Sequence, residues 1–325
     1  MEYRTLPDTD LNVSVIVFGS PANGGFLSGE KQNGIEAIRA AYRAGVTTID
    51  TAPLYGLGAA ESLVGEAIAC LPREKVQILT QFGLRWNIGQ GEPFKSIAGP
   101  NGKPIDIVHN ATRESVIAEC EASLKRLNTD YIDLYQMHWP DDFTPMEETF
   151  EAVQKLIDQG KVRYAGVSNY SAAQMAEAGK HIRVVSDQLH YSMTDRGLER
   201  QTVRYCLDHS KAVFACRPLE GGLLTGTLKP GVNFPAGDFR RGNAKFSDEN
   251  IRRANDFVRY LKPLAEDKKI SVAQLVLRWT VQRPGITAAV AAAGNAVQAI
   301  ENAKAGDIRL TEKEMGYIDS ILPPP

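Results

Sequence analysis

The feature that most constrains the fold is a strand-then-helix pattern that repeats eight times. Short runs rich in β-branched residues alternate with segments of helical periodicity, from "VSVIVFGS" followed by "GIEAIRAAYRAG" to "ITAAVAAA" followed by "NAVQAIENAKA". This alternation predicts βα units, in which crossover helices join parallel strands. Eight such units in 325 residues most simply close into a (β/α)8 barrel of the α/β class.

An open, doubly wound sheet is the competing architecture. It would need a glycine-rich phosphate fingerprint after the first strand, but the glycines of "GSPANGGFLSG" have the wrong spacing and do not lead directly into a helix. No Pro/Gly/Ser-rich linker divides the chain, so residues 1–325 are predicted to form one domain. The last helix has a capping box, with Thr311 as the cap and Glu314 three residues later.

Composition and charge exclude several classes of protein. The hydrophobic fraction of 43% is normal for a globular core, and the formal net charge of −2 does not favour a nucleic-acid or membrane partner. No apolar run is long enough to span a bilayer. The four cysteines are widely separated, which predicts a reducing, cytoplasmic location and neither a disulfide framework nor a metal site.

Three ionisable residues stand at predicted strand ends, where barrel enzymes place their chemistry. Asp50 ends the strand in "TTIDTAPLYG", Tyr55 follows it, and His138 ends "YIDLYQMHWP". A tyrosine, an imidazole and a carboxylate that converge at a barrel mouth would form a proton-transfer site.

Several long motifs carry a family resemblance. "GVTTIDTAPLYGLGAAESLVGEAI", "DYIDLYQMHWPD", "GKVRYAGVSNYS" and "GGLLTG" resemble the aldo-keto reductases, in order and over essentially the whole chain. The resemblance implies a (β/α)8 barrel with an N-terminal β-hairpin and a C-terminal helix. It also implies that Asp50, Tyr55 and His138 are catalytic, with Tyr55 as the proton donor to a carbonyl oxygen while NADPH delivers hydride.

The resemblance also assigns binding residues. The nicotinamide carboxamide would be held by Ser168, Asn169 and Gln188. Other dinucleotide contacts would come from segment 216–222, namely from Arg217, Leu219 and Gly222. The substrate pocket would be lined by Trp86 and Trp139, although a structural role for both tryptophans stays open.

The chain departs from the family pattern at the cofactor side of the site. Gln81 stands where the family has a catalytic lysine, whose positive charge would lower the pKa of the tyrosine. The resemblance places an aromatic residue at Cys216, a small polar residue at Arg217 and a phosphate-binding arginine at Gly294. Glu220 adds a carboxylate near the expected pyrophosphate path, which is an unfavourable like-charge arrangement.

These departures leave three functions open. The favoured one is non-redox acid–base chemistry, an elimination, dehydration or isomerisation, on a small polar carbonyl or polyol substrate that is sugar-like. In it Gln81 keeps Tyr55 oriented and neutral. The second is an NAD(P)H-dependent aldehyde or ketone reductase in which Arg217 takes over a phosphate contact. The third is a non-catalytic subunit of the channel-associated type.

Substrate identity and oligomeric state are not readable from the sequence, and a homo-oligomer stays open. Two long polar insertions, residues 85–110 and 228–250, are predicted to be loops that shape the pocket.

Overall fold

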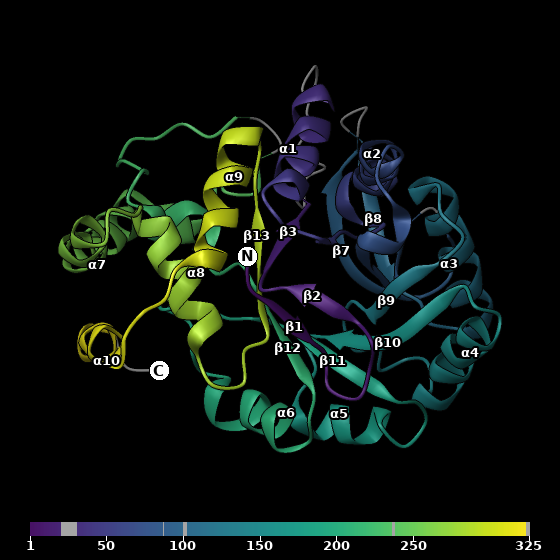
Figure 1. The fold of residues 1–325 in the computed structure, drawn as a ribbon. Coiled ribbons are helices and arrows are strands. Elements are labelled where there is room, and N and C mark those ends of the chain that lie inside the picture. The colour runs from purple at the N-terminus through teal and green to yellow at the C-terminus, as the bar shows by residue number, and fades with distance from the viewer. Residues whose placement is uncertain (21–30, 87, 100–102, 236–237, 323–325) are drawn as a thin grey trace.

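Eight parallel strands close into a barrel, as predicted. The computed structural model describes residues 1–20, 31–86, 88–99, 103–235 and 238–322. The strands pair in the order β10–β11–β12–β13–β3–β4–β5–β9, with β9 returning to β10 (Figure 1). In chain order they are β3 (Ile16–Gly19), β4 (Thr48–Asp50), β5 (Gln77–Phe82), β9 (Ile132–Met137), β10 (Val162–Ser168), β11 (Val184–His190), β12 (Ala212–Cys216) and β13 (Ala288–Ala292).

Helices surround the barrel, and most of them bury residues in the cluster around it (Figure 1). They are α1 (Lys31–Arg43), α2 (Ala59–Ile68), α3 (Arg113–Leu127), α4 (Met146–Asp158), α5 (Ala172–Ala178), α6 (Arg204–Asp208), α7 (Asp248–Asp267), α8 (Val272–Gln282), α9 (Ala296–Lys304) and the C-terminal α10 (Glu312–Ile321). The chain after β12 contains both α7 and α8, where the sequence predicts one helix.

Local sequence sets where several helices begin and end. The predicted capping box of Thr311 and Glu314 is present at α10, and Ser271 with Gln274 forms a second one at α8. After α1 the chain turns at Gly45, whose φ of +92° favours a residue without a side chain. These caps satisfy backbone N–H groups that a helix end otherwise leaves without partners.

The N-terminal hairpin closes one end of the barrel. Strands β1 (Tyr3–Thr5) and β2 (Asn12–Ser14) pair antiparallel and lie across the near end of the barrel in Figure 1. Leu6 and Leu11 of this hairpin are buried in the same cluster as Val17 and Leu79 of the barrel strands. The C-terminal ends of the strands, where the candidate site lies, are therefore at the opposite end.

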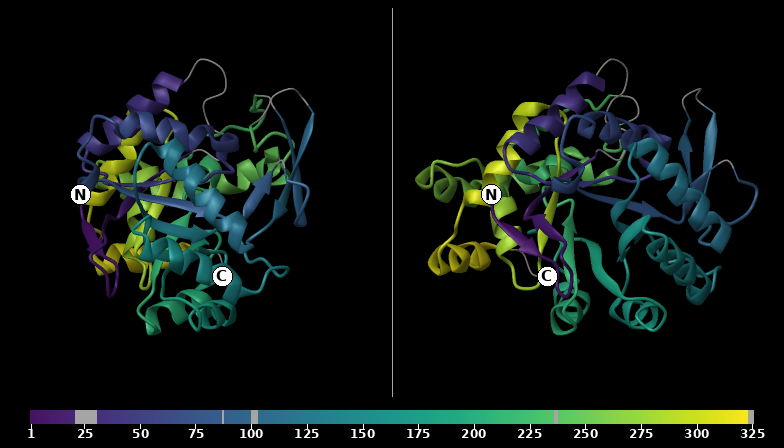
Figure 2. Two further views of the ribbon diagram at one scale, coloured as in Figure 1. Left: turned by 90° about the vertical axis from the view of Figure 1, so that its right-hand side faces the viewer. Right: turned by 45° about the vertical axis from the view of Figure 1, so that its right-hand side comes forward.

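The predicted loop at 85–110 is largely a small sheet, so the prediction of a loop is wrong for its described part. Strands β6 (Leu84–Trp86), β7 (Glu92–Ala98) and β8 (Pro104–His109) pair antiparallel in the order β6–β8–β7. Figure 2 shows this sheet, in blue, projecting from the barrel. The register shifts between Pro93 and Lys95, so β7 contains a β-bulge at Phe94.

The second predicted loop, 228–250, contains a short 3₁₀ turn (Ala244–Phe246) and leads into α7. Most of the segment "GSPANGGFLSG" after the first strand lies outside the described residues. Within the part of the chain that the structure describes, no helix is both long and apolar enough to cross a membrane.

Candidate active site

The three side chains predicted to transfer protons meet at the open end of the barrel. Asp50 ends β4 and is buried, Tyr55 begins the 3₁₀ turn Tyr55–Gly58, and His138 follows β9 directly. The rings of Tyr55 and His138 lie edge to face, with 6.0 Å between their centroids. The charge of Asp50 acts on Tyr55. The structure thus brings the three groups together, and their catalytic roles stay a prediction.

Backbone contacts hold Tyr55 and His138 in place. The Asn169 side chain donates a hydrogen bond to the His138 carbonyl at 3.0 Å, and the His138 N–H donates to the Phe82 carbonyl at 2.9 Å. Close to Tyr55, Gly58 has a φ of +95°, and a Cβ at this position would meet Arg126 at 2.8 Å. Glycine is therefore needed where the Tyr55 turn packs against α3.

Asp50 is the group of this trio that titrates near neutral pH. Burial raises its pKa to about 7, although a hydrogen bond from Gln188 acts in the opposite direction. Gln188 Nε2 donates to Oδ2 at 3.2 Å, whereas Oδ1 has no hydrogen-bond partner among the described residues. A carboxyl group whose pKa lies near the working pH can both accept and donate a proton.

Tyr55 and His138 are both neutral near pH 7. Burial raises the pKa of Tyr55 well above its usual value, the charges of Asp50 and Cys216 add to this, and Arg217 opposes it. Burial, together with the smaller effects of Lys95 and His109, lowers the pKa of His138 to about 3. The phenol can therefore donate a proton, while the imidazole can only orient a substrate or act as a weak base.

Among the described residues, Gln81 forms its side-chain hydrogen bond with Gln188, and its predicted role in keeping Tyr55 oriented and neutral stays a prediction. Gln81 Nε2 donates to Gln188 Oε1 at 3.2 Å, and Gln136 Nε2 donates to the same oxygen at 2.9 Å. The register of β5 and β9 places Gln81 opposite Gln136. Any influence of Gln81 on Tyr55 passes through Gln188 and Asp50. The sequence signal for Gln136 was a polar residue inside the apolar run "YIDLYQMH".

The residues predicted to hold a carboxamide lie together at the ends of β10 and β11. Ser168 Oγ donates to the Gln188 carbonyl at 2.8 Å, and Asn169 Nδ2 donates to Ser168 Oγ at 3.0 Å. Asn169 has a φ of +62°, which asparagine tolerates better than most residues, and its N–H donates to the Gln188 carbonyl at 3.1 Å. These hydroxyl and amide groups are chemically suited to a carboxamide.

The segment after β12 forms a series of tight turns. Arg217 is exposed and has a φ of +55°, and its carbonyl accepts a hydrogen bond from the Glu220 N–H at 2.9 Å. Leu219 packs against the buried cluster that contains Leu277, so it has a structural role. Gly222 has a φ of +103° and donates its N–H to the Leu219 carbonyl at 2.9 Å. Of the three predicted contact residues in this segment, Arg217 is the charged one.

Glu220, predicted to repel a pyrophosphate, is buried and paired inside the protein. Its carboxylate accepts a hydrogen bond from Ser192 Oγ at 2.5 Å and forms an ion pair with Lys245. Burial alone would raise its pKa, but hydrogen bonds from His190, Lys245 and Ser192 outweigh burial and lower it to about 2. Glu220 is thus a fixed anion, and the ion pair with Lys245 weakens the predicted repulsion.

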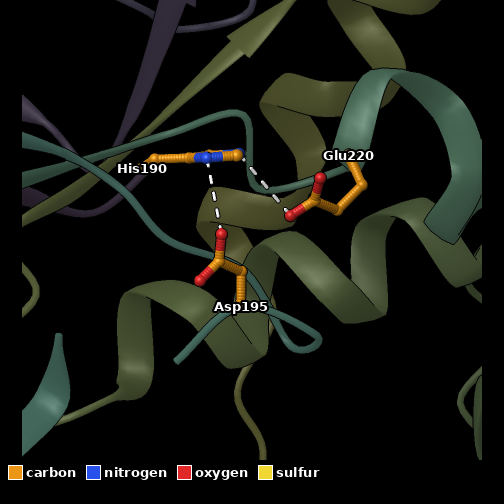
Figure 3. Close-up of side chains that lie close together, drawn as sticks. All are labelled: His190, Asp195 and Glu220. Atoms are coloured by element: carbon orange, nitrogen blue, oxygen red, sulfur yellow. Dashed lines mark ion pairs between the residues drawn. The ribbon is translucent and has the colours of Figure 1, made fainter. Parts of the chain in front are cut away.

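Figure 3 shows a cluster that the sequence analysis did not identify, formed by His190, Asp195 and Glu220. The imidazole Nδ1 faces Asp195 Oδ2 at 3.4 Å, and Nε2 faces Glu220 Oε1 at 3.6 Å. A metal ion would need one ring nitrogen and both carboxylates directed at a single point. Here each nitrogen faces a different carboxylate, which is the geometry of an ion-pair network. The absence of a bound metal stays a prediction.

The two predicted pocket tryptophans differ in position. Trp139 directly follows His138, is 39% exposed and lies 6.0 Å from the Phe94 ring, measured between ring centroids. Trp86 ends β6 and pairs in register with Ile107 of β8. The small sheet therefore meets the barrel beside His138, and Trp139 is better placed than Trp86 to contact a substrate there.

The residues present fit a nicotinamide dinucleotide only in part. Ser168, Asn169 and Gln188 supply polar groups for the carboxamide, although the Gln188 amide is already held by its neighbours. Cys216 offers no ring for stacking, and Gly294 offers no side chain for a phosphate; its N–H donates to Gln298 Oε1 at 2.8 Å. These residues suit the carboxamide of the nicotinamide, but they fit the nicotinamide ring and the phosphate groups poorly.

Comparison with known proteins places this site in a family. The family model "Aldo/keto reductase family" matches residues 15–323. An aldo-keto reductase of Bacillus subtilis (strain 168) is 36% identical over 289 residues, 88% of this chain and 82% of that protein. An NADH-specific methylglyoxal reductase of Escherichia coli (strain K12) is 32% identical over 324 residues, covering 97% of this chain and 96% of that protein.

The structure of a glycerol dehydrogenase from Gluconobacter oxydans superposes with a TM-score of 0.86 at 31% identity. The match covers 98% of this chain and 94% of that one. Fold and sequence similarity therefore agree, and the chain belongs to the aldo/keto reductase family of enzymes.

Proposed function

We propose that this enzyme performs acid–base chemistry on a small polar carbonyl or polyol substrate through Asp50, Tyr55 and His138. Its favoured reaction is non-redox, an elimination of water or an isomerisation. The observation that carries this proposal is the neutral amide of Gln81 where the family has an ammonium group. Without that cation, burial dominates and the pKa of Asp50 rises to about 7. Asp50 then titrates near neutral pH and can exchange protons with a substrate.

Elimination of water from a β-hydroxy carbonyl compound shows how the trio would work. Asp50, in its ionised form, removes the proton next to the carbonyl group. The neutral Tyr55 phenol protonates the departing hydroxyl group, so that water leaves, and the imidazole of His138 hydrogen-bonds the carbonyl oxygen. No electrons leave the substrate, so the reaction needs no hydride acceptor. Proton return from Asp50 to Tyr55 completes the cycle.

A nucleotide-dependent reductase is the second candidate. The grouping of Ser168, Asn169 and Gln188 favours it, and so do the reductase and dehydrogenase names of its relatives. In that case Ser168, Asn169 and Gln188 would hold a nucleotide that would supply a hydride, and Tyr55 would donate the proton that the alcohol product needs. A neutral phenol can do this, whereas the reverse oxidation needs a phenolate. This second function therefore predicts faster reduction than oxidation at neutral pH.

One set of measurements separates these functions. The purified protein is titrated with NADPH and NADH while tryptophan fluorescence is followed, and sugars, hydroxyketones and enals are screened for turnover without nucleotide. We expect nucleotide-free turnover that falls by about 10²–10⁴-fold in Tyr55→Phe. Tyr317→Phe is the matched control, because the Tyr317 side chain is exposed on α10 and bonds the Tyr260 carbonyl.

The outcomes are distinct. Micromolar NADPH binding with hydride transfer, and no turnover without nucleotide, would select the reductase. Full activity of Tyr55→Phe would remove Tyr55 from either mechanism. A protein that only binds a partner would show neither nucleotide affinity nor turnover.

A further inference from the structure

Two cations near the open end of the barrel, Lys95 and Arg217, contact aromatic rings. Among the described residues, neither Lys95 nor Arg217 forms an ion pair or a hydrogen bond through its side chain, and both side chains are exposed. Each lies over an aromatic ring instead. The Lys95 ammonium is 5.3 Å from the centre of the Phe94 ring, and the Arg217 guanidinium is 5.4 Å from that of Phe239. Such contacts orient a cation without neutralising it.

Both cations stand at irregular points of the backbone. Lys95 directly follows the β-bulge at Phe94, and bulges redirect the side chains beside them. Arg217 has a φ of +55°, which is strained for a residue with a side chain. Strained or bulged backbone near an active site is retained where the direction of a side chain matters. Neither feature is needed to close the barrel itself, since Lys95 lies outside it and Arg217 follows the end of β12.

Each cation acts electrostatically on one member of the predicted catalytic pair. Phe94 packs near Trp139, the neighbour of His138, and the charge of Lys95 acts on His138. Arg217 follows the last residue of β12, and its charge acts on Tyr55. The cations also act on each other: partial desolvation lowers the pKa of Lys95, and the charge of Arg217 adds to this. An anion between them would relieve this repulsion.

We propose that Lys95 and Arg217 bind an anionic group, a carboxylate or a phosphate, of the carbonyl or polyol substrate. The inference depends on the proposed function, since it places that substrate over Tyr55 and His138. A lysine supplies a point charge and an arginine a planar fork, and together they suit the oxygens of either group. The substrate class is thus narrowed from neutral sugars to acidic or phosphorylated ones.

The test compares three probes of one carbon skeleton: glycerol, D-glycerate and glycerol 3-phosphate. Binding to the full chain is measured by calorimetry. We expect at least one anionic probe to bind about tenfold or more tightly than glycerol, because a charge-assisted hydrogen bond contributes about 1.5–3 kcal/mol. Lys95→Gln and Arg217→Gln should each lower the affinity for that anionic probe by about tenfold, and the affinity for glycerol should not change. Which anion binds shows whether the group is a carboxylate or a phosphate.

Matched controls come from the same two segments. Lys103→Gln changes an exposed lysine next to β8 in the same small sheet, and Arg241→Gln changes an exposed arginine in 228–250. Both controls should bind the anions as the wild type does. Equal affinity of the wild type for all three probes would overturn the inference. So would an anion preference that survives in the double variant of Lys95 and Arg217.

A third result would also overturn the inference. If NADPH displaces the anionic probe, and Arg217→Gln loses affinity for NADPH, the cations serve the nucleotide and not the substrate. Failure of the proposed function is read separately. It appears as full turnover in Tyr55→Phe, which changes none of the binding results above.

Discussion

Position 81 carries a neutral amide, and its hydrogen bonds link it to Asp50. Gln81 bonds Gln188, and among the described residues Gln188 donates the one side-chain hydrogen bond that reaches the Asp50 side chain. A neutral donor cannot compensate for burial, so the pKa of Asp50 is about 7. Tyr55 is a neutral phenol, because burial raises its pKa.

This electrostatic arrangement makes stability depend on pH. The folded-state pKa of Asp50 is about 7 and the unfolded value is about 3.9, so between these values the folded state keeps a proton that the unfolded state has lost. The contribution of Asp50 to the free energy of unfolding is therefore most favourable below about pH 4. It falls as pH rises to about 7, by up to about 4 kcal/mol, and then levels off.

Replacing the carboxyl group should remove this dependence. We expect Asp50→Asn to be more stable than the wild type at pH 8 and nearly equal to it at pH 4, as measured by urea unfolding at both values. Gln81→Lys should also raise stability at pH 8 relative to the wild type, because a nearby ammonium group lowers the pKa of Asp50. If the urea unfolding curves of the wild type and Asp50→Asn shifted equally between pH 4 and pH 8, Asp50 would not be the group that makes stability depend on pH.

The sequence predicted part of the site because strand ends of a barrel must converge. Asp50, His138 and Ser168 were found from their positions at the ends of apolar runs. Gln136 and Lys95 were not found, because their importance depends on which residue lies opposite in the register and on how the small sheet meets the barrel. Those relations link residues that are far apart in the chain.

At the scale of elements, periodicity predicted the eight barrel strands but not the sheet β6–β8–β7. In 85–110 the glycines and prolines around "PIDIVH" indicate a loop, although this short run alternates as a strand does. The run pairs with "EPFKSIA", and nothing in the sequence indicates which segment is its partner. The helix α8 was also missed, although its capping box at Ser271 is a readable signal.

The cap at Ser271 gives a prediction for α8. Ser271 Oγ accepts a hydrogen bond from the Gln274 N–H at 3.2 Å, and the helix buries Trp279 against the barrel. Ser271→Ala should therefore lower the free energy of unfolding by about 1 kcal/mol. Ser320→Ala is the control, since Ser320 is exposed on α10 and only bonds the Tyr317 carbonyl. An equal loss of unfolding free energy in both variants would show that the Ser271 cap does not stabilise the protein specifically.

At the scale of the molecule, the hairpin and the barrel share one apolar cluster, and we propose that the whole chain folds as one domain. Leu11 is 1% exposed in that cluster. Leu11→Ala should lower the free energy of unfolding by about 2–5 kcal/mol, because it leaves a cavity at the closed end of the barrel. Turnover should be unchanged in folded protein, since Tyr55 lies at the other end.

Denaturant unfolding and activity measured on the same samples check this prediction. Val297→Ala serves as the control, because Val297 is 75% exposed. Loss of activity in folded Leu11→Ala would mean that the hairpin influences the chemistry at long range.

The plug formed by Leu6 and Leu11 also has a kinetic consequence. Because these side chains fill the hairpin end among the described residues, we expect substrate to reach Tyr55, and product to leave it, at the opposite end of the barrel. Product inhibition should therefore be competitive with substrate, and bulky changes at the entrance should slow arrival and departure together.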